Sequence, residues 1–314
     1  PILGYSGSGS ILTGSILTGS ILTSSILNRG ALRLGVYLSK STTNMSTDQS
    51  WPVALTIAGS DSGGGAGIQA DLRTFSFHRV HGTSAVTCIT AQNTVGVNRV
   101  DALPPEAVMA QVEAVVDDMG VQAVKTGMLL NQEIIQAVAA YWQRVSSPPS
   151  LVVDPVMVSR TGAQLIDDAA IATLIQHLIP QAQILTPNRY EAALLSELKI
   201  ETLSDMEAAA IKIHQLGPAR VLVKGGGMEA DLRGVDVWFD GQDLSILRTE
   251  TVDTLDTHGT GCTLSAAIAA NLARGEKPLT AVTHAKDYVT TALKHSLRIG
   301  RGQGPVGHFF PLLA

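Results

Sequence analysis

The chain of 314 residues is 45% apolar and 16% charged, with a formal net charge of −5. This composition excludes a disordered or collagen-like chain and provides no basic stripe for binding nucleic acid. Its two cysteines, Cys88 and Cys262, lie far apart and form neither a disulfide framework nor a zinc motif. No run approaches about 18 uninterrupted apolar residues and no secretory signal is recognisable, so we expect a cytoplasmic protein without a membrane partner.

Residues 1–50 differ from the rest of the chain. The first 44 residues contain no Asp or Glu, and the pentapeptide GSILT begins at Gly9, Gly14 and Gly19. A period of five keeps the Ile-Leu pair on no constant face of a helix or strand, so we expect a low-complexity, disordered N-terminal extension. Because the first methionine is Met45, we expect that the residues before it are an upstream stretch that was included in the sequence in error. A transit peptide is the alternative, because the segment is poor in acids and rich in Ser and Thr.

From Trp51 onward, short β-rich runs alternate with helical patterns. Continuous runs rich in Val, Ile and Thr predict buried strands over Val53–Ala58, Thr83–Ala91, Val121–Lys125, Leu151–Val153, Gln183–Thr186 and Arg220–Lys224. Apolar spacing and capping signals predict helices over Pro105–Met119, over Asn131–Val145, and from a Ser204–Glu207 capping box to Gly217. Val235–Phe239 and Leu244–Arg248 predict a hairpin at a sheet edge. The alternation predicts an α/β fold with a mostly parallel central sheet and helices on both faces.

A glycine-rich segment follows the first predicted strand, at the end where ligands bind in such sheets. Four glycines between Gly63 and Gly67 leave backbone N–H groups free to approach a ligand closely. The chain contains no Gly-Lys-Ser/Thr phosphate loop. The G-x-G-x-x-A pattern over Gly65–Ala70 matches a dinucleotide site, but no acid lies between Asp71 and Asp101, where that site needs one. A dinucleotide site and a turn that merely packs a helix onto the sheet remain alternatives.

A second glycine-containing loop, Asp256-Thr257-His258-Gly259-Thr260-Gly261-Cys262, opens a helix that continues through Leu272. Gly259 and Gly261 bring N–H groups and the positive end of the helix dipole to one point, which would stabilise a phosphate or the charge developing in phosphoryl transfer. Cys262 stands in the first turn, which is expected to lower its pKa and favour the thiolate. The alternative is a small cysteine filling a gap. The other histidines, His308 among them, are interpreted as ordinary surface or helix residues.

Three further strand ends carry polar side chains. Asp154 follows one strand, Glu191 lies in the helix after another, and Lys224 precedes the run Gly225–Gly227. The two carboxylates could hold Mg²⁺ directly or through water, while the lysine and the glycines suit phosphate oxygens. Each residue alone could instead be a cap or a turn residue.

Together these motifs resemble the hydroxymethylpyrimidine/phosphomethylpyrimidine kinase family of thiamine biosynthesis, a branch of the ribokinase-like superfamily. In chain order, the segments that carry the resemblance are Ala58–Asp61 with Gly63–Leu72, Ala91–Thr94, Lys125–Leu129, Asp154–Met157, Thr186–Asn188 with Glu191-Ala192, Lys224–Gly226 and His258–Thr263. The resemblance implies a three-layer fold and a single kinase domain over residues 51–314. It also implies a homodimer.

The resemblance further implies phosphorylation of 4-amino-5-hydroxymethyl-2-methylpyrimidine, and then of its monophosphate, with ATP and Mg²⁺ as cofactors. It assigns the pyrimidine to Gly59, Asp71, Gln92, Met128 and Val156, the metal to Asp154 and Glu191, the nucleotide side to Asn188, Lys224 and Thr257, and catalysis to Gly259, Thr260, Gly261 and Cys262. In the family, the cysteine at position 262 is proposed to take the proton of the hydroxymethyl group.

Two other functions are compatible with much of this pattern. A vitamin B6 kinase of the same fold would accept a pyridine of similar shape, although the segment Ala91–Thr94 favours the pyrimidine. A non-catalytic metabolite-binding protein would be expected to lack the glycines of the second loop, Lys224 or the acidic groups, and all of these are present.

Overall fold

The computed structural model describes residues 51–158 and 164–313. Its strands are β1 (Val53–Asp61), β2 (His81–Gln92), β3 (Val97–Ala102), β4 (Ala123–Thr126), β5 (Ser150–Val153), β6 (Ile184–Leu185), β7 (Val221–Val223), β8 (Val235–Phe239) and β9 (Leu244–Arg248). Its α-helices are α1 (Gly67–Phe77), α2 (Pro105–Met119), α3 (Gln132–Arg144), α4 (Asp168–Thr173), α5 (Arg189–Ser196), α6 (Leu203–His214), α7 (Thr260–Ala273) and α8 (Pro278–Lys294). Short helical turns η1 (Leu174–Leu178), η2 (Ile179–Gln181), η3 (Ala230–Leu232) and η4 (Phe310–Leu312) complete the list. The extension predicted over residues 1–50 lies outside the described residues.

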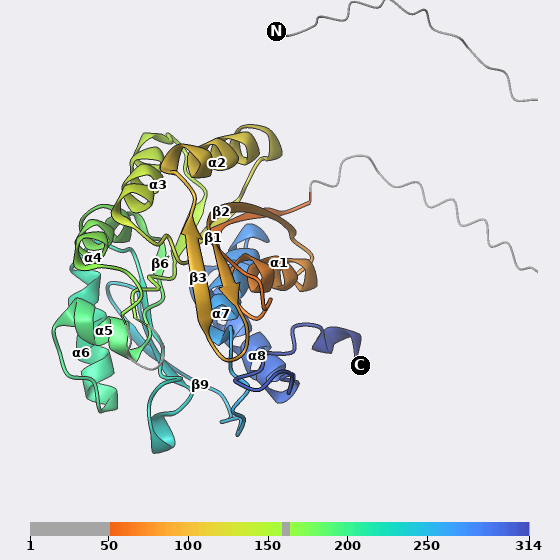
Figure 1. Cartoon of the computed structure of the whole chain (residues 1–314). Helices are drawn as coiled ribbons and strands as arrows, with labels where there is room; N and C mark the ends of the chain where they lie inside the picture. Colours follow the sequence, from red (N-terminus) through yellow and green to blue (C-terminus); the bar gives the residue numbers. More distant parts are fainter. Residues whose placement is uncertain (1–50, 159–163, 314) are drawn as a thin grey trace, which may run out of the picture. The chain divides into compact units, whose positions relative to one another are not determined.

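The described strands form one sheet in the order β3-β2-β1-β4-β5-β6-β7-β8-β9 (Figure 1). The strands from β2 to β7 in this order are parallel, and β3, β8 and β9 pair antiparallel at the two edges. This confirms the mostly parallel sheet and the edge hairpin expected from the sequence. The carboxyl ends of the parallel strands therefore lie along one edge, where the polar post-strand residues gather.

Neighbouring side chains along each buried strand belong to different cores, because strand side chains alternate between the two faces. Leu55 and Val153 lie in the core packed by α2 to α6, whereas Ala54 and Val152 lie in the core packed by α1, α7 and α8. Figure 1 shows the two sets of helices on opposite sides of the sheet. The three-layer arrangement is thus present in the described residues.

The observed helix boundaries show which signals in the sequence predict a helix end correctly and which do not. α2 has the predicted limits, with Pro105 in its first turn and Gly120 in the left-handed conformation at its end. The Ser204–Glu207 capping box is wrong. Thr202 caps α6 instead, because its side chain accepts from the Asp205 N–H at 3.1 Å while the Asp205 carboxylate accepts from the Thr202 N–H at 2.8 Å.

The sequence does not predict the edge strand β3, because all of its residues are exposed and it has no apolar run to mark it. The described residues also include no helix that is long and apolar enough to span a membrane.

Candidate active site

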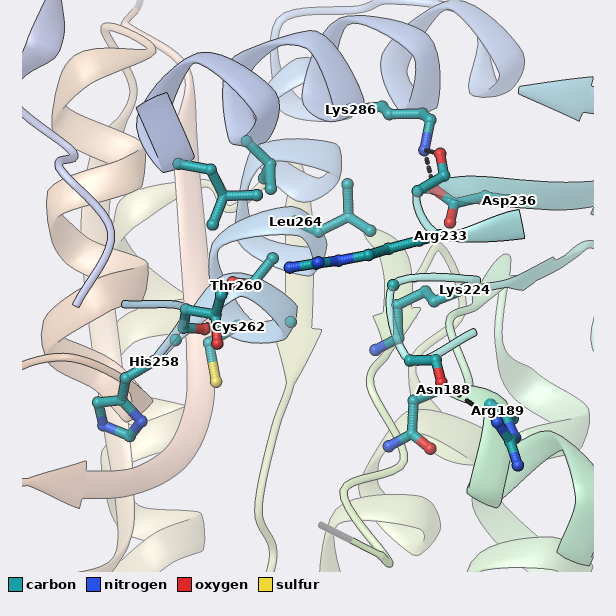
Figure 2. Close-up of a pocket in the computed structure, with 18 of the residues that line it drawn as sticks. Asn188, Arg189, Lys224, Arg233, Asp236, His258, Thr260, Cys262, Leu264 and Lys286 are labelled. Carbon is teal, nitrogen blue, oxygen red and sulfur yellow. Dashed lines mark hydrogen bonds and ion pairs between the residues drawn. The ribbon is translucent and has the colours of Figure 1, made fainter. Parts of the chain in front are cut away.

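A pocket of about 450 Å³ opens at the carboxyl ends of the strands. Figure 2 shows His258, Thr260 and Cys262 on one side of it and Asn188 and Lys224 on the other. Most residues that the sequence places in the site line this pocket, namely Asp154, Val156, Asn188, Glu191, Lys224, Thr257, Gly259, Thr260, Gly261 and Cys262. Gly59, Asp71, Gln92 and Met128, assigned to the pyrimidine, are not among its lining residues.

Lys224 and Asp154 form an ion pair beside the start of α7. The Lys224 Nζ donates to Asp154 Oδ1 at 2.9 Å, and Ser265 Oγ donates to Asp154 Oδ2 at 3.2 Å. A Cβ on Gly261 would lie 3.5 Å from Lys224 Nζ, so the first turn of α7 packs against this pair. Burial opposes the charge of Lys224, but Asp154 and Glu191 outweigh it and raise the lysine pKa. An ammonium group and a helix N-terminus therefore meet at one point.

Asn188 and Glu191 are engaged in the cap of α5. Asn188 Oδ1 accepts from the Glu191 N–H at 3.1 Å, and the Glu191 carboxylate accepts from the N–H groups of Asn188 and Met157 at 2.8 and 3.1 Å. The Asn188 amide also donates to the Val158 carbonyl at 3.0 Å. Burial raises the pKa of Glu191 to about 7, although Lys224 lowers it. The cap alternative is therefore confirmed for Glu191, and the Asn188 side chain is already occupied as the N-cap of α5.

The loop before α7 is shaped by Gly259, which has a φ of +81°. A Cβ at this position would collide with the carbonyl oxygen of Gly65, so the two glycine-rich loops approach one another as only glycine allows. Thr260 directs its hydroxyl and its N–H to the Thr257 carbonyl at 2.6 and 3.3 Å. The next two N–H groups, of Gly261 and Cys262, have no acceptor within the helix and carry the positive end of its dipole, whereas the Thr263 N–H donates to the Gly259 carbonyl at 2.9 Å.

Cys262 lies in the first turn of α7, and the Gly67 N–H at the start of α1 acts to lower the pKa of its thiol. Burial nevertheless raises the pKa of this thiol, and the nearby Lys125 offsets the effect only in part. The expected thiolate is therefore wrong for this structure. Desolvation of the charged form outweighs the stabilisation by the helix N-termini and the lysine.

The glycine-rich segment after β1 does not leave its N–H groups free. The Asp61 carboxylate accepts from Gly63, Gly65 and Ala66 N–H groups at 2.8, 3.1 and 2.8 Å, and it also binds His258 Nε2 at 2.9 Å. Burial opposes ionisation, but these hydrogen bonds hold the pKa of Asp61 below its usual range. The expectation of free N–H groups is thus wrong, because an acidic side chain of the chain itself fills the space an anion would take.

Behind the pocket, Asp71 and Lys125 form a wholly buried pair at 2.8 Å. Asp71 Oδ2 also accepts from the Thr56 hydroxyl at 2.6 Å, while Asp71 Oδ1 has no hydrogen-bond partner among the described residues. Burial raises the pKa of Asp71 even though Lys125 lowers it. One buried carboxylate oxygen is therefore available to a ligand that donates a hydrogen bond.

The other residues assigned to the pyrimidine from the sequence are Gly59, Gln92, Met128 and Val156. A Cβ on Gly59 would lie 3.0 Å from Met128 Cε, so the β1 backbone approaches that thioether closely. Gln92 Nε2 lies 3.4 Å from His258 Nε2, which borders the pocket. Val156 lines the pocket with a φ of +40°, a conformation that a β-branched residue adopts only under constraint from its surroundings.

Two buried groups of the site were missed in the sequence. Lys125 belongs to β4 and has no exposed side-chain surface, and a lysine inside an apolar strand was the available signal for it. His308 is buried, not a surface residue, and its Nε2 lies 2.9 Å from Thr263 Oγ1. Because that hydroxyl donates to the Gly259 carbonyl at 2.8 Å, His308 must donate to it, and thereby supports the start of α7. No local pattern marks this contact.

Comparison with known proteins identifies the relatives of this chain. The family model of phosphomethylpyrimidine kinase matches residues 61–307. The chain belongs to the phosphomethylpyrimidine kinase family. It is 61% identical over 261 residues to the hydroxymethylpyrimidine/phosphomethylpyrimidine kinase of Synechococcus elongatus, covering 83% of this chain and 98% of that enzyme. The resemblance expected from the motifs is therefore confirmed.

Two solved structures place the family among vitamin kinases of one fold. The ADP complex of Bacillus subtilis pyridoxal kinase is 38% identical, with a TM-score of 0.76, and the match covers 84% of this chain and all of that one. The phosphomethylpyrimidine kinase of Clostridium difficile is 42% identical, with a TM-score of 0.69, and the match covers 77% of this chain and 99% of that one. The ribokinase-like fold is thereby confirmed.

Proposed function

We propose that this chain transfers the terminal phosphoryl group of ATP to 4-amino-5-hydroxymethyl-2-methylpyrimidine, and then to the monophosphate formed, in thiamine biosynthesis. The observation that carries the proposal is the meeting of three features in one pocket of a chain of this family. These are the Lys224–Asp154 pair, the first turn of α7, and the Cys262 thiol. Residues 51–314 would act as one kinase domain.

In this proposal, the pocket holds the nucleotide with its phosphates towards Lys224 and Gly261. In the first transfer, the bond from the γ-phosphorus to the ADP oxygen breaks as a bond to the hydroxymethyl oxygen forms, and the hydroxyl proton is released. In the second transfer, a phosphate oxygen of the monophosphate takes the place of the hydroxymethyl oxygen. Because the transition state of such transfers is loose, positioning and stabilisation of the phosphoryl oxygens carry most of the acceleration. Lys224 and the N–H groups of Gly261 and Cys262 would perform that task.

Cys262 is the proposed acceptor of the hydroxyl proton. Its thiol must lose its own proton first, which its buried position opposes and the neighbouring Lys125 ammonium favours. The rate of proton transfer would then depend on how far substrate binding lowers the pKa of the Cys262 thiol.

The donor set fits Mg²⁺ bound together with a nucleotide. Mg²⁺ commonly takes one or two carboxylates and completes its shell with phosphate oxygens and water. Asp154 and Glu191 line the pocket and influence one another electrostatically, and no cluster of three or more metal-binding side chains occurs in the described residues. Because the oxygens of both groups already accept from Lys224, Ser265 and backbone N–H groups, these carboxylates would hold the ion through water, and the ion would neutralise phosphate charge.

The pyrimidine would bind over the buried Asp71–Lys125 pair. The free Asp71 Oδ1 would accept a hydrogen bond from the ring or its exocyclic amine, and the Gln92 amide would supply a further donor or acceptor. Met128 and Val156 would contact the two faces of the ring. Gly59 would let the β1 backbone approach it closely.

A pyridoxal kinase is the second candidate function. The observation that favours it is the backbone likeness to Bacillus subtilis pyridoxal kinase, whose TM-score of 0.76 exceeds the 0.69 of the Clostridium difficile phosphomethylpyrimidine kinase. A pyridine with a hydroxymethyl group presents the same nucleophile to the same phosphate site. The homodimer and the cytoplasmic location stay predictions.

The test is product analysis. The chain is incubated with ATP, Mg²⁺ and hydroxymethylpyrimidine, and separately with pyridoxal, and the mono- and diphosphates are resolved by chromatography. We expect pyrimidine monophosphate followed by diphosphate, and slower use of pyridoxal. Phosphorylation of pyridoxal alone would replace the proposal by the second candidate, and no phosphorylation of either would refute both.

A further inference from the structure

One cation that borders the pocket, Arg233, has no assigned role and no partner among the described residues. Arg233 lies in the turn between η3 and β8, and Figure 2 shows its side chain extended across the pocket towards Thr260 and Leu264. Its guanidinium takes part in no ion pair or hydrogen bond with the described residues. Guanidinium groups that are partly removed from water are normally paired with an acid or another hydrogen-bond acceptor. A ligand would supply such a partner for Arg233.

The other long cations of the pocket are already engaged. Lys224 pairs with Asp154 at 2.9 Å and Lys286 pairs with Asp236 at 2.7 Å. Arg189 donates to the Gly227 carbonyl at 3.3 Å and lies over the Tyr190 ring. Arg233 is therefore the cation of this pocket whose charge is not met by any contact in the described residues.

The backbone beneath Arg233 is fixed from both sides. Thr251 Oγ1 donates to the Arg233 carbonyl at 3.2 Å, and the Gly234 N–H donates to the Gly225 carbonyl at 3.3 Å. Lys286 Nζ donates to the Gly234 carbonyl at 2.7 Å. The Arg233 side chain, which has no partner in the part of the chain that the structure describes, is thus attached to a backbone held by three hydrogen bonds, which lowers the entropic cost of ordering this segment around a ligand.

The same hydrogen bonds join Arg233 to the predicted phosphate loop. Asp236, the partner of Lys286, also accepts from the Gly225 N–H at 2.8 Å. A Cβ on Gly225 would collide with the Val235 carbonyl oxygen, so the loop that follows Lys224 packs directly on the segment that carries Arg233. The backbone that carries Arg233 is thereby held at a set position relative to Lys224 and the start of α7.

From this arrangement we infer that Arg233 binds the polyphosphate of the nucleotide. The inference rests on the proposed function, which puts a nucleotide in this pocket. Two parallel N–H groups of a guanidinium match two oxygens of a phosphate group, which a lysine ammonium cannot reproduce. Phosphate oxygens are the ligand chemistry that this unpaired, positioned cation fits, and Arg233 would be a binding residue and not a group that takes part in proton transfer.

The experiment compares the full-length chain with Arg233→Ala and Arg233→Lys. ADP binding is measured by calorimetry, and the KM values for ATP and for hydroxymethylpyrimidine are measured separately. Loss of one charge-assisted phosphate contact is expected to weaken ADP binding about 10- to 100-fold. The KM for ATP should rise with it, while the KM for the pyrimidine should stay unchanged, and the lysine variant should lie between the alanine variant and the original chain. Inorganic tripolyphosphate should compete with ATP less well in the alanine variant.

Arg144→Ala is the matched control, because it removes an arginine from the exposed end of α3, outside the pocket. It should leave ADP binding unchanged. Equal ADP affinity in Arg233→Ala and in the original chain would overturn the inference while the proposed function stands. So would an equal rise of both KM values, which indicates a structural role. An original chain that binds ADP but phosphorylates no pyrimidine would refute the proposed function, and the ADP titrations would still decide the role of Arg233.

Discussion

Two lysine–aspartate pairs lie at the same end of the sheet, but in different surroundings. Lys125 and Asp71 are 2.8 Å apart with no exposed side-chain surface, whereas Lys224 and Asp154 are 2.9 Å apart and border the pocket. The Lys224 side chain retains 12% of its exposure. The first pair has no exposed side-chain surface and lies where the proposed pyrimidine would bind, whereas the second borders the pocket and can exchange its partner for an incoming phosphate.

The difference in exposure predicts whether loss of a charge in each pair lowers mainly the stability of the fold or mainly ligand binding. A charge with no access to water depends wholly on its partner, so removing one member should act mainly on folding. A charge at the border of a pocket can be resolvated, so removing it should act mainly on ligand binding and catalysis. The following variants test that division.

The largest effect is expected for Lys125→Met. The change leaves the Asp71 carboxylate buried without its counterion, and the free energy of unfolding should fall by about 3–5 kcal/mol. Denaturant unfolding followed by circular dichroism measures it. The double variant Lys125→Met with Asp71→Leu removes both charges and should recover most of the loss. An unchanged unfolding midpoint in the single variant would contradict the account of the buried Lys125–Asp71 pair.

Cys262→Ala should lower turnover by about 10²- to 10⁴-fold, the usual range for loss of a general base. Because burial raises the pKa of the thiol, turnover of the original chain should rise with pH as the thiol loses its proton. The alanine variant should lack this rise. Turnover is measured as a function of pH, with Cys262→Ser as the variant of similar size. An alanine variant with near-normal turnover would rule out proton transfer to Cys262.

Lys224→Met should lower kcat/KM for ATP by about 10²- to 10³-fold, as removal of a donor to developing negative charge does in other enzymes. Its unfolding free energy should change less than that of Lys125→Met, because Asp154 retains Ser265 as a partner and borders the pocket. Lys212→Met, at an exposed pair on α6, is the control and should change neither quantity. Greater damage to folding than to catalysis in Lys224→Met would refute the division between the pairs.

The smallest of these effects is expected for His308, which supports the start of α7 beside the Lys224–Asp154 pair. Burial lowers the pKa of His308 to about 4 from an ordinary value of 6.5. The unfolded chain therefore binds more protons between these values, and the native state should lose about 3 kcal/mol as the pH falls from 6.5 to 4. Unfolding curves across this range test it. His308→Gln, which keeps a donor for Thr263, should show a shallower dependence. Equal slopes for both chains would contradict it.

Local signals in the sequence predict the fold well. Pro105 and Gly120 fix both ends of α2, and uninterrupted runs of β-branched residues mark the buried strands. The sequence gives a wrong prediction where two neighbouring capping boxes are possible, and it gives no prediction where a strand has no apolar pattern. Thr202 and Asp205 have the same capping-box spacing as Ser204 and Glu207, and they begin α6 about half a turn earlier. The exposed strand β3 shows no alternation of apolar and polar residues.

The site was predicted less completely, because its electrostatics depend on tertiary partners. The sequence places Asp61 next to the glycines but cannot show that its carboxylate binds their N–H groups. It places Cys262 at a helix N-terminus but cannot weigh that against burial. Lys125 acquires its partner from α1, and His308 reaches Thr263 from the end of the chain. Such contacts arise only when distant segments pack together.

The most direct test of the central claim is a competition assay in the chain and in Lys224→Met. Hydroxymethylpyrimidine and pyridoxal are supplied together at equal concentration with ATP and Mg²⁺, and the initial rates of both products are measured. The account predicts that pyrimidine phosphates dominate and that Lys224→Met loses both activities in parallel, since both substrates would use one phosphate site. Dominant pyridoxal phosphate, or a Lys224→Met variant with undiminished rates, would contradict it.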